Sequence, residues 1–183
     1  SSDGPGELLV RHAGDDPRHG FFAGYFKNQA ATDEAWKDGW FHTGDIVCRD
    51  PDGSVFFVDR KKNVIRRSGE NIAAVEVESA LSRHPSIDAV AVAPVPDAIR
   101  GDEVFALVVA KEHGSQALAM AITTWCLEEL AYYKAPGYVA FVDALPLTAT
   151  QKIQRAALKT EAAQRLDHPD TIDTRALKKR RTA

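Results

Sequence analysis

The amino-terminal third of the chain alternates between short apolar runs and polar turns. Residues 6–11 have the pattern of a strand, and residues 32–36 that of a short helix. Residues 40–49 are again strand-like, and Asp50-Pro51-Asp52-Gly53 has the residues of a type I turn in the right order. Residues 54–59 then return as a partner strand, which predicts a hairpin. Because so few apolar residues cannot close a core of their own, we expect these strands to belong to a larger β-rich sheet.

After Arg60 the pattern changes to strands that alternate with helices. A short strand is predicted at 63–67, three sheet strands at 87–95, 104–111 and 138–144, and helices at 73–83, 115–131 and 153–166. Ser115 has the side chain expected at a helix N-cap. This alternation predicts a small mixed three-stranded sheet packed with helices, an α/β (or α+β) unit that follows the hairpin remnant of a larger domain.

The change of pattern predicts three segments. Residues 1–61 are expected to be the incomplete end of a large amino-terminal domain, and residues 62–166 a small second domain. Residues 167–183 are expected to be a basic, solvated tail, since they end in the run Lys178-Lys179-Arg180-Arg181. The chain begins Ser-Ser-Asp-Gly and its only methionine is Met120, so we expect this start to lie inside a longer reading frame.

Composition excludes several classes of protein. The chain is 44% hydrophobic and 27% charged, which is ordinary for a globular protein, and its net charge of −3 gives no reason to expect a nucleic acid partner. No apolar stretch approaches the ~20 residues that span a bilayer, so no integral membrane segment is expected. The two cysteines and six histidines form no disulfide or zinc spacing, which predicts no metal in this part and a reducing, cytoplasmic setting.

Three short segments contain candidate chemistry. In Thr43-Gly44-Asp45, the aspartate could accept two hydrogen bonds from a vicinal diol such as that of a ribose, or could simply be a solvated residue at the end of a strand. In 59–72, five cations precede Ser68-Gly69, where the backbone can turn and approach a ligand closely; a charged surface strand is the alternative. Lys152 follows a polar loop and precedes a helix, so its charge could bridge a carboxylate and a phosphate, or could be inert.

Together, in this order and at this spacing, the three segments resemble the family of acyl- and aryl-CoA synthetases, luciferases and peptide-synthetase adenylation domains. The resemblance extends from Gly6 to about Leu158. The motifs that support it are GELLVR at 6–11, Gly24-Tyr25, GWFHTGD at 39–45, DRKK at 59–62, SGENI at 68–72, Glu76-Val77-Glu78, Lys134-Ala135-Pro136 and LPLTATQKI at 145–153. Within the family, DRKKNVIRRSGEN and residues 96–101 look most like carnitine- or crotonobetaine-CoA ligases and medium-chain acyl-CoA synthetases.

The resemblance implies an AMP-forming acid–thiol ligase. Such an enzyme joins a carboxylic acid to ATP, with Mg²⁺, to give an acyl-adenylate, and CoA then displaces AMP. By position, the resemblance implies the following roles: Asp45 and Arg60 at the ATP/AMP ribose, Lys62 as the hinge, Ser68, Gly69 and Glu70 at the CoA tunnel, and Lys152 as the catalytic lysine. The oligomeric state stays open, with a homodimer among the candidates.

Two positions depart from the family pattern. Gln151 stands where the family usually has glycine, and Arg66 stands where some members have a second catalytic lysine. An arginine cannot be deprotonated in a protein, so Arg66 is not expected to transfer a proton.

The family's phosphate loop and its adenine and magnesium segment do not occur in this sequence, so the 183-residue polypeptide alone is expected to be inactive. Two other interpretations remain: an adenylation domain that loads a carrier-protein thiol, and a non-catalytic interaction module of the same fold.

Overall fold

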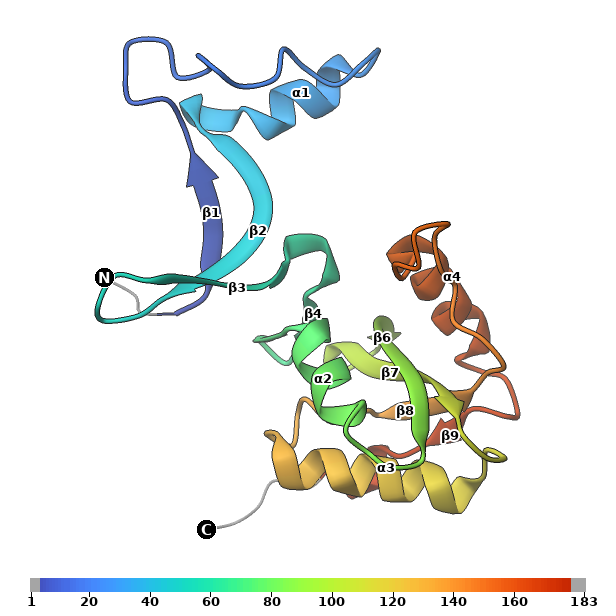
Figure 1. The fold of residues 1–183 in the computed structure, drawn as a ribbon. Helices are drawn as coiled ribbons and strands as arrows, with labels where there is room; N and C mark the ends of the chain where they lie inside the picture. The colour runs from blue at the N-terminus through green and yellow to red at the C-terminus, as the bar shows by residue number, and fades with distance from the viewer. Residues whose placement is uncertain (1–3, 179–183) are drawn as a thin grey trace. The chain divides into compact units, whose positions relative to one another are not determined.

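The computed structural model describes residues 4–178, and the chain divides into two units between Lys62 and Asn63 (Figure 1). The division falls one residue after the boundary expected from the sequence. Each unit has its own sheet.

The first unit contains a three-stranded antiparallel sheet, in which β2 pairs with both β1 and β3. Its elements are β1 (Gly6–Val10), α1 (Gln29–Ala35), the 3-10 helix η1 (Lys37–Gly39), β2 (Phe41–Arg49) and β3 (Val55–Arg60). The turn predicted between the last two strands is present: the Gly53 amide donates to the Asp50 carbonyl over 2.9 Å. Gly53 has a φ of 91°, a left-handed conformation that glycine adopts without steric cost.

Burial in the first unit is poor for its apolar residues. Three consecutive side chains on β3, Val55, Phe56 and Phe57, are 50%, 52% and 59% exposed. Ala35 and Trp36, at the end of α1, are the apolar residues buried there. Exposed aromatic side chains in a row are unusual on a free surface, and the expectation that this hairpin belongs to a larger sheet stays a prediction.

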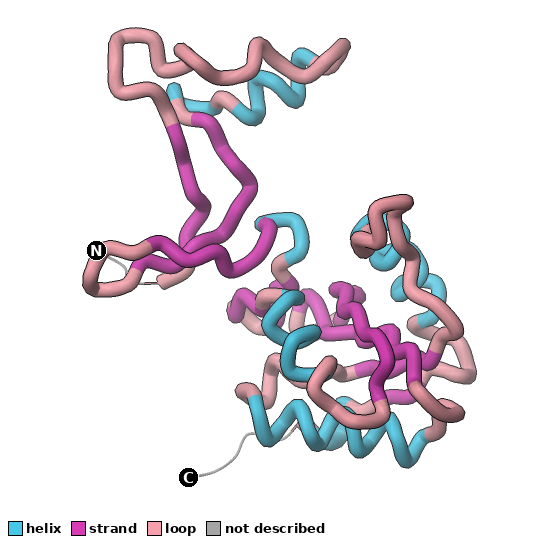
Figure 2. Tube along the Cα trace, viewed as in Figure 1, coloured by secondary structure: helices cyan, strands magenta, loops and turns pink. Residues whose placement is uncertain are grey.

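The second unit is a six-stranded mixed sheet covered by helices (Figures 1 and 2). The strands lie in the order β5-β4-β7-β8-β9, with β6 also paired to β7. Their bounds are β4 (Ile65–Arg67), β5 (Glu70–Ile72), β6 (Ile87–Asp97), β7 (Gly101–Ala110), β8 (Tyr138–Phe141) and β9 (Ile172–Asp173). β6 and β7 are antiparallel, whereas β7 and β8 are parallel. The remaining elements are η2 (Lys61–Asn63), which spans the division, α2 (Ala74–Leu81), α3 (Gln116–Glu129), α4 (Arg155–Arg165) and η3 (Arg175–Leu177).

The core of the second unit has two layers because successive residues of a strand point to opposite faces. On β7, Val104 and Val108 belong to a cluster with α2 and α3, while Phe105 and Leu107 pack with α4 on the other face (Figure 1). The predicted mixed α/β fold is confirmed, but the sheet has six strands where the sequence predicted three; the separate short strand predicted at 63–67 belongs to this sheet as β4. Ser115 caps α3 as predicted, since its hydroxyl accepts a hydrogen bond from the Leu118 amide at 3.1 Å.

The carboxyl-terminal residues differ from the solvated tail expected from residue 167. Residues 172–173 pair with β8 as β9, and Thr174 and Lys178 are buried. The physical reason is that Lys178 has a buried carboxylate partner, which the charge pattern of the run does not reveal. The rest of the basic run, from Lys179 to Arg181, lies outside the described residues. Among residues 4–178, no helix is both long and apolar enough to cross a membrane.

Candidate functional site

The first unit brings Asp45 and Arg60 together. β2 and β3 pair in a register that places these two residues opposite each other. Arg60 Nε lies 2.7 Å from Asp45 Oδ1, and Arg60 Nη1 donates a hydrogen bond to the Thr43 carbonyl over 3.4 Å. Both side chains are partly exposed, although the Oδ1 atom of Asp45 is itself buried. A ligand diol could therefore contact Asp45 beside a fixed positive charge.

Glu7 holds the backbone that leads to Asp45. Its Oε1 accepts a hydrogen bond from the Gly44 amide at 3.2 Å, and its Oε2 lies 2.8 Å from Lys61 Nζ and 3.3 Å from His42 Nδ1. Burial raises the pKa of Glu7, but the hydrogen bonds and charges of Lys61 and His42 outweigh burial, so this pKa lies below its ordinary value. An ionised Glu7 thus links β1 to the Thr43-Gly44-Asp45 segment.

A cavity of about 630 Å³ opens beside these residues. Its lining comes from the first unit and includes Glu7, Tyr25, His42, Gly44, Arg60, Lys61 and Lys62, together with residues of α1 and η1. A volume of several hundred Å³ with a few polar groups is typical of a small-molecule site. Asp45 lies next to this lining through Gly44 and Arg60.

In the second unit, Ser68 and Gly69 form the two-residue turn between β4 and β5. The flanking pair is Arg67 with Glu70, and the φ angles of Ser68 and Gly69 are 52° and 85°. Two positive φ angles are typical of a type I′ turn, which matches the twist of a hairpin. Apart from Ser68, Gly69 and Glu70 themselves, no heavy atom of residues 4–178 lies within 4 Å of where a Gly69 Cβ would be, so the space beside this glycine is open.

Lys152 lies at the end of a closed loop that leads into α4. The loop is closed by hydrogen bonds from the Thr148 amide to the Lys152 carbonyl at 2.7 Å and from the Gln154 amide to the Pro146 carbonyl at 2.8 Å. The Lys152 amide donates to the Thr148 hydroxyl over 3.1 Å, and the Lys152 side chain is exposed. Gln151 has a φ of 60°, so it adopts the left-handed conformation that glycine adopts at lower steric cost.

The predicted site residues therefore fall into two groups. Asp45, Arg60 and Lys62 belong to the first unit, whereas the Ser68–Glu70 turn and Lys152 belong to the second. Lys62 is exposed and is the last residue before the division of the chain. The functions of these residues stay predictions.

Sequence reasoning missed the roles of Glu7 and His42. Both occur in motifs that support the family resemblance, GELLVR and GWFHTGD. Nothing in the spacing shows that the Glu7 side chain, on β1, accepts a hydrogen bond from the Gly44 amide on β2. It also missed Glu103, a carboxylate at 0% exposure in an apolar strand. A charged residue inside an apolar strand is itself a signal, because such a residue needs a buried partner.

The chain also matches known proteins. Residues 76–152 match the family model described as the AMP-binding enzyme C-terminal domain. The match ends on Lys152.

Relatives of the chain include CoA ligases. The chain is 38% identical over 164 residues to a long-chain-fatty-acid–CoA ligase of Escherichia coli O157:H7, covering 90% of the chain and 28% of the relative. It is 36% identical over 155 residues to a crotonobetaine/carnitine–CoA ligase of Proteus mirabilis, covering 84% and 29%. The resemblance inferred from the motifs is therefore confirmed.

A solved structure of a CoA ligase is also similar to this chain. The anthranilate CoA ligase AuaEII, in complex with anthranoyl-AMP, superposes with a TM-score of 0.75 at 31% identity, covering 91% of this chain and 31% of that one. The chain thus spans about three tenths of the length of the proteins it matches. Within residues 4–178, no group of three or more His, Cys, Asp or Glu could hold a metal ion.

Proposed function

We propose that this chain serves an ATP-dependent carboxylic acid–CoA ligase. The reaction would first form an acyl-adenylate and pyrophosphate, and CoA would then displace AMP to give a thioester. The observation that carries the proposal is the Asp45–Arg60 pair beside a cavity, in a chain that also has an AMP-binding enzyme C-terminal domain.

The polar side chains beside the cavity are suited to binding a nucleotide ribose. Asp45 would accept hydrogen bonds from the two ribose hydroxyls, and Arg60 would keep that carboxylate charged and in place. Glu7 would position the segment by holding the Gly44 amide. The triphosphate, with Mg²⁺, supplies the leaving pyrophosphate when ATP is bound.

The second unit would supply the mobile groups. Lys152 would place its positive charge near the reacting carboxylate and phosphate, where charge redistributes in the transition state. The Ser68-Gly69-Glu70 turn would lie along the path of the CoA thiol, since Gly69 leaves open space for a narrow ligand. A change in the backbone torsions of Lys62 would switch between two arrangements. In one, Lys152 faces the reacting carboxylate and phosphate; in the other, the Ser68-Gly69-Glu70 turn faces the CoA thiol.

The substrate class and compartment belong to the same proposal. Long-chain fatty acids and carnitine-like acids are the substrates named for the two relatives, so an aliphatic carboxylic acid of fatty acid metabolism is the proposed class. Both cysteines, Cys48 and Cys126, are free thiols, which agrees with a reducing cytoplasmic compartment.

A graft tests this function. The 164 matched residues of the Escherichia coli O157:H7 ligase are replaced by the matching residues of this chain, giving what we call the grafted ligase. We expect it to make acyl-CoA from a long-chain acid, ATP and CoA. The same relative with the matched region deleted is the control, and should make none.

The outcomes separate the proposed ligase from the other two interpretations. Pyrophosphate release without thioester formation on CoA, but with thioester formation on a carrier-protein thiol, would replace CoA by a carrier as the acceptor. A folded grafted ligase with no ATP-dependent pyrophosphate release would contradict a catalytic function and favour the interaction module.

A further inference from the structure

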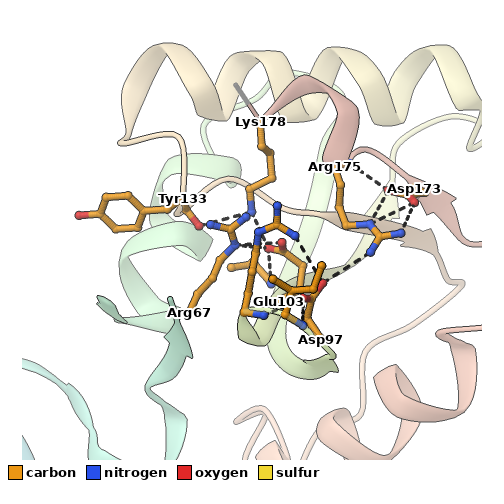
Figure 3. A network of polar contacts seen from close by, with 10 residues as sticks. Arg67, Asp97, Glu103, Tyr133, Asp173, Arg175 and Lys178 are labelled. Atoms are coloured by element: carbon orange, nitrogen blue, oxygen red, sulfur yellow. Dashed lines mark hydrogen bonds and ion pairs between the residues drawn. The ribbon is translucent and has the colours of Figure 1, made fainter. Parts of the chain in front are cut away.

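Glu103 is a buried carboxylate on β7 on which two cations converge (Figure 3). Arg67 Nε lies 3.0 Å from its Oε1 and 2.9 Å from its Oε2, while Lys178 Nζ lies 2.5 Å from Oε1. The Val104 amide also donates to Oε1 over 2.9 Å. Removing one partner of such a buried group leaves an uncompensated charge, which is strongly unfavourable.

The backbone at Gly137 leaves room for the Glu103 side chain. A Cβ on Gly137 would lie 2.5 Å from Glu103 Cγ, so only glycine leaves room for the carboxylate side chain. The Gly137 carbonyl accepts the Thr174 amide at 2.9 Å, and the Thr174 hydroxyl donates to the Pro136 carbonyl over 2.9 Å. The residues just before Lys178 are therefore fixed to the same place as Glu103.

Arg175 provides a second connection (Figure 3). It binds Asp173 with an Nη2–Oδ2 distance of 2.7 Å and lies 3.5 Å from Asp97 Oδ2. Asp97 in turn accepts the amides of Ile99 and Arg100 at 3.0 and 2.9 Å. Arg175 thus reaches the turn that joins β6 to β7.

Both connections end at the turn between β4 and β5. Arg67 immediately precedes this turn and pairs with Gly101, and the Ser68 amide donates to the Arg100 carbonyl over 2.8 Å. Ser68 and Gly69 have positive φ angles, which are costly for Ser68 and must be held by their surroundings.

We propose that residues 173–178, which we call the clasp, position the Ser68–Gly69 turn through Glu103 and Asp97, with Lys178 as the main positioning residue. The importance of that turn for the thiol step rests on the proposed function. The coupling between the clasp and the turn does not, because it follows from contacts within the second unit.

Lys178 gives this coupling a spectroscopic signature. Burial lowers the pKa of Lys178 to about 8, which the attraction of Glu103 only partly offsets. The charged or titratable groups that face it are Glu103 on β7, Arg67 on β4 and Cys126 on α3, and burial raises the pKa of Cys126 to about 12. Loss of the Lys178 proton should therefore change the charge balance at Glu103 and Arg67, and with it the turn.

The test uses the 183-residue chain, so it requires no catalytic activity. Backbone ¹³C shifts of Ser68 and Gly69 are followed across pH, and we expect a transition near pH 8 that Lys178→Met removes. At neutral pH, hydrogen exchange of the Ser68 amide should rise by about tenfold in Lys178→Met. Lys178→Arg, which retains the charge, should restore most of the protection, and Lys159→Met, at an exposed position of α4, should change neither signal.

Arg175→Gln provides an independent variant, since Arg175 is partly exposed and its loss is not expected to unfold the chain. It should raise exchange at Ser68 and Arg100 while Val92 and Val108, in the core strands, keep the wild-type rate. Unchanged exchange at Ser68 in both Lys178→Met and Arg175→Gln would overturn the proposal. So would an equal rise at Val92 and Val108, because that result would mean general destabilisation.

Discussion

At the scale of single residues, Asp45 is the group on which nucleotide recognition depends in this account. Asp45→Ala removes up to two charge-assisted hydrogen bonds of about 1.5–3 kcal/mol each, so ATP binding by the grafted ligase should weaken by roughly a hundredfold or more. The mutation should weaken binding of a deoxyribose analogue much less. Equal weakening of ATP and the analogue, measured by calorimetric titration, would exclude the diol contact.

A second prediction for a single residue concerns Gln151, which occupies a left-handed conformation in the loop before Lys152. Replacing it with glycine relieves about 1–2 kcal/mol of strain, while the greater freedom of glycine in the unfolded chain costs about 0.5–1 kcal/mol. Gln151→Gly should therefore stabilise the second unit by about 0.5–1 kcal/mol in urea unfolding.

The matched control for that variant is Gln164→Gly, on the exposed side of α4. Glycine inside a helix costs about 1 kcal/mol relative to alanine, so this change should destabilise the unit. If both variants destabilise the protein alike, the positive φ of Gln151 carries no strain.

At the scale of elements, the segment at Lys61–Asn63 separates the two units. Proline fixes φ near −65°, so Lys62→Pro in the grafted ligase should retain one half-reaction and lose most of the other. Lys62→Ala keeps the backbone free and should leave both rates close to those of the parent. Two normal rates in Lys62→Pro, measured by pyrophosphate exchange and by thioester formation, would place the hinge elsewhere.

The elements also show what the sequence could and could not predict. The strand β6 was predicted from alternating apolar and polar residues, and β7 from a nearly continuous apolar run. The helix α3 was predicted from its amphipathic pattern, with Ser115 as its N-cap. β5 and β9 were not predicted as strands, because two or three residues have too short a pattern to detect and their pairing depends on distant partners. The family motifs predicted that Asp45 and Arg60 lie at the same ribose; the structure pairs their side chains, and their role at a ribose stays a prediction.

The clasp, residues 173–178, is a further feature that the sequence could not predict. Lys178 opens a run of four cations, which by local pattern indicates a solvated tail. Its partner Glu103 lies 75 positions away in the chain. Only the fold brings them together, so no local rule could distinguish Lys178 from an exposed lysine.

At the scale of the whole molecule, the two units should differ in stability. The second unit has two buried clusters around its sheet, whereas β3 in the first unit has three exposed apolar side chains. We therefore expect amides of β6 and β7 to exchange more slowly than those of β1, β2 and β3 in the 183-residue chain. The opposite order, measured by hydrogen exchange with mass spectrometry, would contradict this assignment of the stable core.

Lys152 is proposed to act in the adenylate-forming step of an acid–CoA ligase. The most direct measurement compares Lys152→Ala with Lys159→Ala in the grafted ligase, in both half-reactions. Lys152→Ala should lower ATP–pyrophosphate exchange by about 10²–10³-fold, because a preorganised charge is lost where charge develops. It should leave thioester formation from added acyl-AMP close to the parent rate, and Lys159→Ala should leave both half-reactions unchanged. Equal loss of the two half-reactions in Lys152→Ala, or no loss in either, would contradict the account.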